Sequence, residues 1–143
     1  MEAQADPLAA ARQEIAAIKP AYIKSKGWRV RALEDKEDGC IRLFVEMPLK
    51  EKRYVLRLTC GLDMPEERPR EAFVNPDNWD EEGRQFWPSG GPFRPEEHGG
   101  IVCIPGVWGF HNILHRGDPN HPPQEQSILR TLLMIQGQLD RMA

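Results

Sequence analysis

The sequence lacks the features that mark several large classes of protein. Its 19 basic residues are outnumbered by 22 acidic ones, giving a formal net charge of −3. It therefore has no basic excess of the kind that nucleic-acid-binding domains usually show. No stretch approaches the roughly 20 consecutive apolar residues that a membrane span needs. The N-terminus has no basic segment followed by an apolar core, so we expect no secretory signal.

Cysteine is also scarce. The 3 cysteines are odd in number and irregularly spaced, which excludes a complete disulfide framework and favours a reducing compartment. A chain of 143 residues can bury a core without covalent staples. We therefore expect one cytoplasmic domain over residues 1–143, acting without nucleic acid or membrane.

An amphipathic helix is predicted over residues 7–19. Asp6-Pro7 suits a helix entry, because Asp is a good N-cap and Pro loses no hydrogen bond at the first helical position. The apolar residues that follow recur at helical spacing. Pro20 is expected to end or bend the helix, because it lacks an N–H group and clashes with the preceding turn.

The apolar period then changes to two, which is typical of strands. Alternating runs occupy residues 28–32, 41–47 and 54–62, although Phe44 interrupts the polar face. The links between them are short and charged, and links of that length join antiparallel strands. A four-stranded antiparallel meander is predicted, with a short fourth strand at residues 71–74, one face toward a core and one toward water.

Residues 75–123 form a long segment rich in Pro and Gly, in which the periodic pattern is lost. Such a long loop in a compact domain is usually functional. Its aromatic residues are expected to anchor it to the core: Trp79, Phe86, Trp87, Phe93, Trp108 and Phe110. A second amphipathic helix is predicted over residues 124–141, entered by Pro122-Pro123.

This order of elements resembles the ubiquitin-conjugating enzyme (UBC-like) fold, as do three blocks of sequence. These are Tyr54–Leu58 with Pro65 and Pro69 before Phe73, the Gly100-Ile101-Val102-Cys103-Ile104 segment, and Ser127–Gln136. The resemblance implies an α+β fold with an N-terminal helix, a four-stranded antiparallel meander, a long active-site loop and a C-terminal helix. It also implies that Cys103 accepts a ubiquitin-like protein as a thioester from an activating enzyme and transfers it to an amine. A ligase or a protein substrate would be a further partner.

Three departures indicate a divergent, prokaryotic member. The family carries a His-Pro-Asn tripeptide whose Asn stabilises the oxyanion, and the corresponding residues here are Phe93-Arg94-Pro95. Eukaryotic members usually have two more helices after the last block. The loop after Cys103 is rich in histidine, which the family does not generally show.

From the residue pattern alone, Cys103 could equally be an inert or a reactive thiol, because it lies in a loop bounded by Gly and Pro, whereas Cys40 and Cys60 fit core positions of strands. The resemblance favours Cys103 as the nucleophile. His98 and His111 could fold back toward the sulfur, where an imidazole could stabilise the thiolate or deprotonate an amine, with His111 favoured. Asn112 could replace the missing oxyanion donor. Asp118 could orient an acceptor lysine, although an Asp before Pro is more often a turn residue.

Other interpretations of residues 75–123 remain. His98, Cys103, His111, His115 and His121 are numerous enough to bind zinc, but they lack compact ligand spacing, and a helix carrying His111 and His115 is not expected between Gly109 and Gly117. We therefore predict no metal and no cofactor. The alternatives to a thioester carrier are a non-catalytic UBC-like module that binds a ubiquitin-like protein, and a hydrolase that uses Cys103 with His111.

Overall fold

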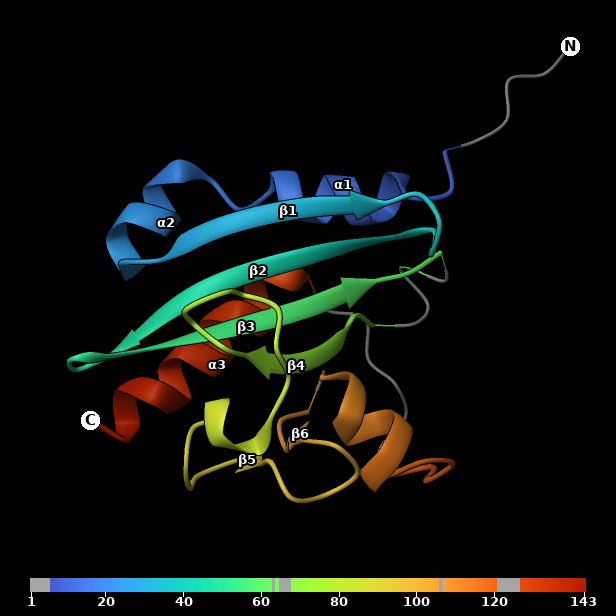
Figure 1. The fold of residues 1–143 in the computed structure, drawn as a ribbon. Coiled ribbons are helices and arrows are strands. Elements are labelled where there is room, and N and C mark those ends of the chain that lie inside the picture. Colours follow the sequence, from blue (N-terminus) through green and yellow to red (C-terminus); the bar gives the residue numbers. More distant parts are fainter. Residues whose placement is uncertain (1–5, 63, 65–67, 106, 121–126) are drawn as a thin grey trace, which may run out of the picture.

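The computed structural model describes residues 6–62, 64, 68–105, 107–120 and 127–143. Two short helices lead into a four-stranded sheet, and an irregular segment then leads to a C-terminal helix that lies behind the sheet (Figure 1). The fold is α+β, with the helix layer on one face of an antiparallel sheet. Among the described helices, none combines the length and apolarity that a membrane crossing requires.

The sheet is the predicted meander. Its strands lie in sequence order, and each pairs antiparallel with the next: β1 (Arg29–Asp35), β2 (Cys40–Leu49), β3 (Lys52–Cys60) and β4 (Arg70–Val74). The fourth strand occupies almost the predicted residues. The register places Val45 opposite Val30 on one side and Leu56 on the other, so the apolar members of three strands share one face.

The core lies between that face and α3 (Ile128–Arg141). The predicted apolar stripe of this helix is fully buried at Ile128, Leu132, Ile135 and Leu139. The helix begins at Ile128 rather than at residue 124, because Ser127 has an extended backbone and its side chain caps the helix by accepting the Arg130 N–H at 3.1 Å. The proposed entry at Pro122-Pro123 lies outside the described residues.

The predicted N-terminal helix over residues 7–19 is present but shorter, and a second helix that was not predicted follows it. The structure has α1 (Ala9–Ala16) followed by α2 (Pro20–Lys26). Pro20 starts the second helix, since a proline at the first helical position is already compatible with helical φ and sacrifices no intrahelical bond. Asp6 does accept the Leu8 N–H at 3.0 Å, but it does so in the turn before α1.

The outer face of the sheet is only partly exposed to water, contrary to the prediction. Phe44, Val55 and Val74 are buried there as a small second cluster, with Trp79 packed against them. The Trp79 ring centroid lies 6.1 Å from that of Phe44. The apolar residue that interrupts the polar pattern of β2 is therefore covered by a loop that follows β4.

Residues 75–120 contain short elements that the sequence pattern does not reveal. They are a 3₁₀ turn η1 (Arg84–Phe86), strands β5 (Phe93–Arg94) and β6 (Ile101–Val102), and a π-helical segment η2 (Phe110–Leu114). The last corrects the expectation that no helix forms between Gly109 and Gly117. The predicted anchoring is confirmed at Trp87 and Phe93, whose rings pack on Phe73 with centroids 5.0 and 5.6 Å away.

Candidate functional site

Cys103 directly follows β6, at the end of a small hairpin that lies below β4 in Figure 1. Its backbone N–H donates to the carbonyl oxygen of Pro92 at 2.7 Å. Ile101, Val102 and Ile104 around it are buried, whereas Cys103 itself is partly exposed. Its backbone is thus held in a packed segment while its side chain reaches the surface.

Cys40 and Cys60 are both buried, as predicted for core cysteines. Burial raises the pKa of the Cys60 thiol to about 12, which keeps it protonated at neutral pH. Cys103 is therefore the cysteine most accessible for thiol chemistry.

Arg94 is the charged residue that the structure brings to Cys103. The antiparallel pairing of β5 with β6 sets Arg94 opposite Ile101, near the cysteine. The pKa of the Arg94 guanidinium is raised above its ordinary value, chiefly by its hydrogen bond to Glu97 and also by the nearby Cys103 side chain. The bond from Arg94 Nη1 to Glu97 Oε2 is 3.2 Å long. A guanidinium in this place can stabilise a thiolate or a developing oxyanion.

Sequence reasoning noted Arg94 only as part of the tripeptide that lacks the family's asparagine. A two-residue strand is too short to show alternation, so its pairing was not predictable from the residue pattern. The charged triplet Arg94, Glu96 and Glu97 before a pair of glycines was the available signal of a hairpin.

His98 lies in the turn that joins β5 to β6. It is exposed, and its backbone adopts a left-handed conformation with φ of 50°. The turn is closed by a hydrogen bond from the Gly100 N–H to the Glu97 carbonyl oxygen at 2.8 Å. These features match a solvated turn residue, and the catalytic role of His98 stays a prediction.

His111 and Asn112 lie on η2. His111 is buried, with only 4% of its surface exposed, and its ring meets that of Phe110 edge-on at 4.9 Å between centroids. The Asn112 side-chain amide donates to the carbonyl oxygen of Trp108 at 3.0 Å. That bond uses one of the two N–H donors of the amide, so the oxyanion role predicted for Asn112 would fall to the other.

His115 and Asp118 belong to the turn after η2. The His115 ring lies 4.4 Å from that of Phe110, and its Nδ1 atom is 3.6 Å from the Asp118 carboxylate. Asp118 also accepts the Asn120 N–H at 2.8 Å, which is the behaviour of a turn residue. In the described part of the chain, no group of three or more His, Cys, Asp or Glu side chains could hold a metal ion. His121 lies outside that part.

Glu71 is a second residue that sequence reasoning missed. It lies on β4 with its side chain on the core face, is only 3% exposed, and accepts backbone N–H groups from Val102 at 3.1 Å and Gly109 at 3.1 Å. Burial raises its pKa from 4.5 to about 7, against the opposing effect of these hydrogen bonds. The signal was an acidic residue two positions before Phe73 in a strand, where alternation puts both on the core face.

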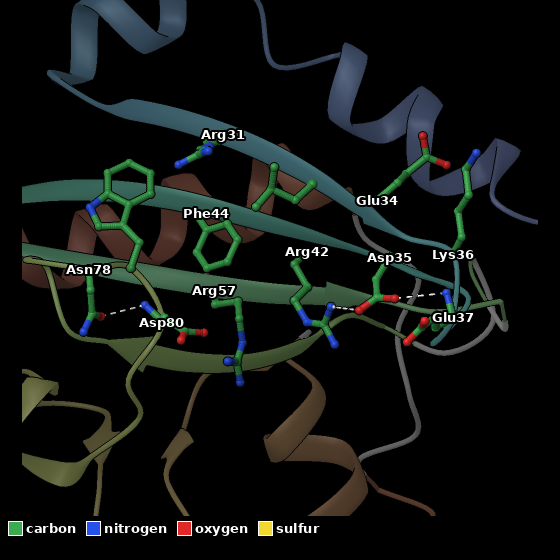
Figure 2. A pocket seen from close by; sticks show the side chains of 12 residues that line it. Arg31, Glu34, Asp35, Lys36, Glu37, Arg42, Phe44, Arg57, Asn78 and Asp80 are labelled. Carbon is green, nitrogen blue, oxygen red and sulfur yellow. Dashed lines mark hydrogen bonds and ion pairs between the residues drawn. The ribbon is translucent and has the colours of Figure 1, made fainter.

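A separate groove of about 520 Å³ lies on the outer face of the sheet (Figure 2). Phe44 and Trp79 supply its aromatic lining, and basic and acidic side chains surround it in equal number. Arg42 is already paired with Asp35, and Arg57 with Glu82, at 2.7 and 2.6 Å. Neither Cys103 nor any of its predicted partners lines this groove.

Comparison of the chain with protein-family models, curated proteins and solved structures finds no match.

Proposed function

We propose that this protein is a divergent UBC-like carrier, which accepts a ubiquitin-like protein as a thioester on Cys103 from an activating enzyme and transfers it to an amine. The observation that carries the proposal is the setting of Cys103. It is a partly exposed thiol on a backbone held between buried residues, with a guanidinium beside it.

The arrangement of elements supports the UBC-like part of the proposal. An N-terminal helical region, an antiparallel meander, a long segment bearing the cysteine and a C-terminal helix follow one another in the order that the resemblance implies. The second N-terminal helix, α2, is an addition to that expectation.

The chemistry needs a nucleophile that can also leave. The Cys103 thiolate attacks the carbonyl carbon of the incoming thioester, and the thiolate of the activating enzyme departs with the electron pair of the broken C–S bond. An amine of the acceptor then attacks the new thioester, the Cys103 thiolate departs, and the amine loses a proton to a base or to water. Each step passes through a tetrahedral intermediate with a negative oxygen.

Arg94 is our candidate for stabilising that charge. It occupies the stretch where the family carries its asparagine, and its guanidinium lies near Cys103. A fixed cation there would favour both the departing thiolate and the oxyanion. His98, His111 and Asn112 stay as predicted candidates for proton transfer and oxyanion binding.

The test is incubation of the protein with ATP, a ubiquitin-like protein and its activating enzyme, using pairs encoded near the gene. We expect an adduct that thiols cleave, that is absent in Cys103→Ala and that resists reductant in Cys103→Lys. Cys40→Ala, which alters a buried thiol, is the matched control and should still form the adduct. Failure to form an adduct with any such pair would contradict the proposal.

A non-catalytic module that binds a ubiquitin-like protein is the second candidate. The absence of the family's His-Pro-Asn tripeptide favours it, because Phe93-Arg94-Pro95 stands in its place. A module of this kind would bind the ubiquitin-like protein equally well with Cys103→Ala and form no adduct. Adding the ubiquitin-like protein to the isotope-labelled chain and following its NMR signals measures binding. Binding without adduct formation identifies the non-catalytic module rather than the carrier.

A further inference from the structure

Both oxygens of the buried Glu71 carboxyl group point at backbone N–H groups of the segment that bears Cys103. Oε2 accepts from Val102 at 3.1 Å, while the Gly109 N–H is shared between Oε1 at 3.1 Å and Oε2 at 3.3 Å. Val102 immediately precedes Cys103, and Gly109 follows it. One side chain of β4 thus ties down the chain on both sides of the cysteine.

Gly109 shows how close this contact is. A Cβ atom at that position would lie 2.8 Å from Glu71 Oε2 and 2.8 Å from a methyl carbon of Ile101. Only glycine therefore allows this backbone to approach the carboxyl group. The preceding residues reinforce the contact, since the Arg70 guanidinium lies 5.0 Å from the centre of the Trp108 ring.

We propose that Glu71 is the positioning residue for Cys103, because its carboxyl group fixes both ends of the 102–109 segment and so determines how the thiol is presented. Its importance for transfer rests on the proposed carrier function. The positioning itself does not, since the hydrogen bonds are part of this fold whatever Cys103 reacts with.

The positioning should depend on pH. The charged and titratable groups on the surrounding elements are Arg70 on β4, Cys103 after β6 and His111 on η2, while β3 presents Leu58 opposite Glu71. The Arg70 charge lowers the Glu71 pKa, but burial outweighs it and raises that pKa to about 7. A segment that opens lets water reach Glu71 and returns its pKa toward 4.5. Protonation therefore favours the closed segment: its extra stability is fully present below about pH 4.5 and is lost as the pH rises through about 7.

The test is hydrogen exchange at the Val102 and Gly109 amides, expressed as protection relative to the unfolded chain. In the unmodified protein, protection should fall several-fold between about pH 6 and about pH 8, on either side of the Glu71 pKa of about 7. Glu71→Gln cannot titrate, so protection should no longer depend on pH in this range. Its amide nitrogen cannot accept an N–H bond, so at least one of the two amides should be less protected than in the unmodified protein at about pH 6. Glu71→Ala should lower protection at both pH values and speed alkylation of Cys103 by iodoacetamide.

Glu46→Gln is the matched control. Glu46 is also buried, at 5% exposed, but its carboxylate accepts from Arg53 at 3.1 Å on the outer face of the sheet. The Glu46→Gln variant should leave the pH dependence of protection at the Val102 and Gly109 amides unchanged. Equal pH dependence in Glu71→Gln and the unmodified protein would overturn the proposal, as would undiminished protection in a folded Glu71→Ala variant. These measurements need no ubiquitin-like protein, so a failed carrier test leaves them intact.

Discussion

Arg94 places a fixed positive charge beside the Cys103 thiol, in a stretch where the family resemblance had shown only a missing asparagine. The guanidinium is held by Glu97 at 3.2 Å, so it is oriented as well as charged. A guanidinium that is already oriented by a hydrogen bond loses less conformational entropy on binding a developing negative charge than a guanidinium without such a bond. At the scale of single residues, the proposed chemistry would therefore depend on the Arg94–Glu97 pair as well as on the cysteine.

Arg94→Ala should slow the alkylation of Cys103 by iodoacetamide at neutral pH by roughly three- to tenfold, because the thiolate loses a stabilising cation. The rate is measured by mass spectrometry of the intact protein. Arg84→Ala removes another exposed arginine of the same segment, paired with Glu96 at 2.9 Å, and should leave the rate unchanged. Equal rates in Arg94→Ala and the unmodified protein would show that the guanidinium does not act on the thiol.

At the scale of elements, the loop after β4 is part of the sheet's packing. It turns back so that Trp79, with φ of 56°, covers Phe44 and its buried neighbours. A left-handed backbone is unfavourable for a bulky residue, so packing of the indole must hold it there. The loop thereby supplies one wall of the outer groove shown in Figure 2.

Trp79→Ala should lower the free energy of unfolding by about 2 kcal/mol, less than for a fully buried tryptophan because Trp79 is only partly buried. Urea denaturation followed by circular dichroism measures the change. Arg31→Ala lies in the same groove but removes an exposed side chain, and should change stability by less than about 0.5 kcal/mol. If both variants unfolded at the same urea concentration, packing of the Trp79 indole on the outer face of the sheet would not contribute to stability.

At the scale of the whole molecule, a buried ion pair joins three distant parts of the chain. Glu14 on α1 accepts two hydrogen bonds from Arg68, the shorter at 2.9 Å, and one from the Ile128 N–H at 2.9 Å. The Arg68 side chain is only 4% exposed. The first turn of α3 is therefore satisfied by a carboxylate from the other end of the sequence as well as by its own cap.

Glu14→Ala should destabilise the fold by about 3–5 kcal/mol, because it leaves the Arg68 charge buried without its partner. Thermal unfolding of the variant measures the loss. Glu34→Ala breaks the exposed pair with Arg12 and should cost less than about 1 kcal/mol. A loss for Glu14→Ala no greater than that for Glu34→Ala would mean that water reaches Arg68.

Much of the sheet and the core was predictable, while the surroundings of Cys103 were not. Alternation in residues 41–47 and 54–62 and helical spacing at Ile128, Leu132, Ile135 and Leu139 are local signals, and the structure follows them. Pro20 was misread because one residue type can end a helix or begin one. The segment around Cys103 consists of two-residue strands and single turns, too short for a period to develop.

The sequence by itself determined the antiparallel meander, the C-terminal helix and the separation of Cys103 from two core cysteines, because these depend on apolar periodicity and short links. Only the tertiary structure decided what surrounds that cysteine. Arg94 lies near it through a hairpin. Glu71 on β4 accepts from the backbone on either side of it, at Val102, which is 31 residues away in the sequence, and at Gly109. Such contacts depend on chain segments meeting in space, and no local pattern of residue types encodes that meeting.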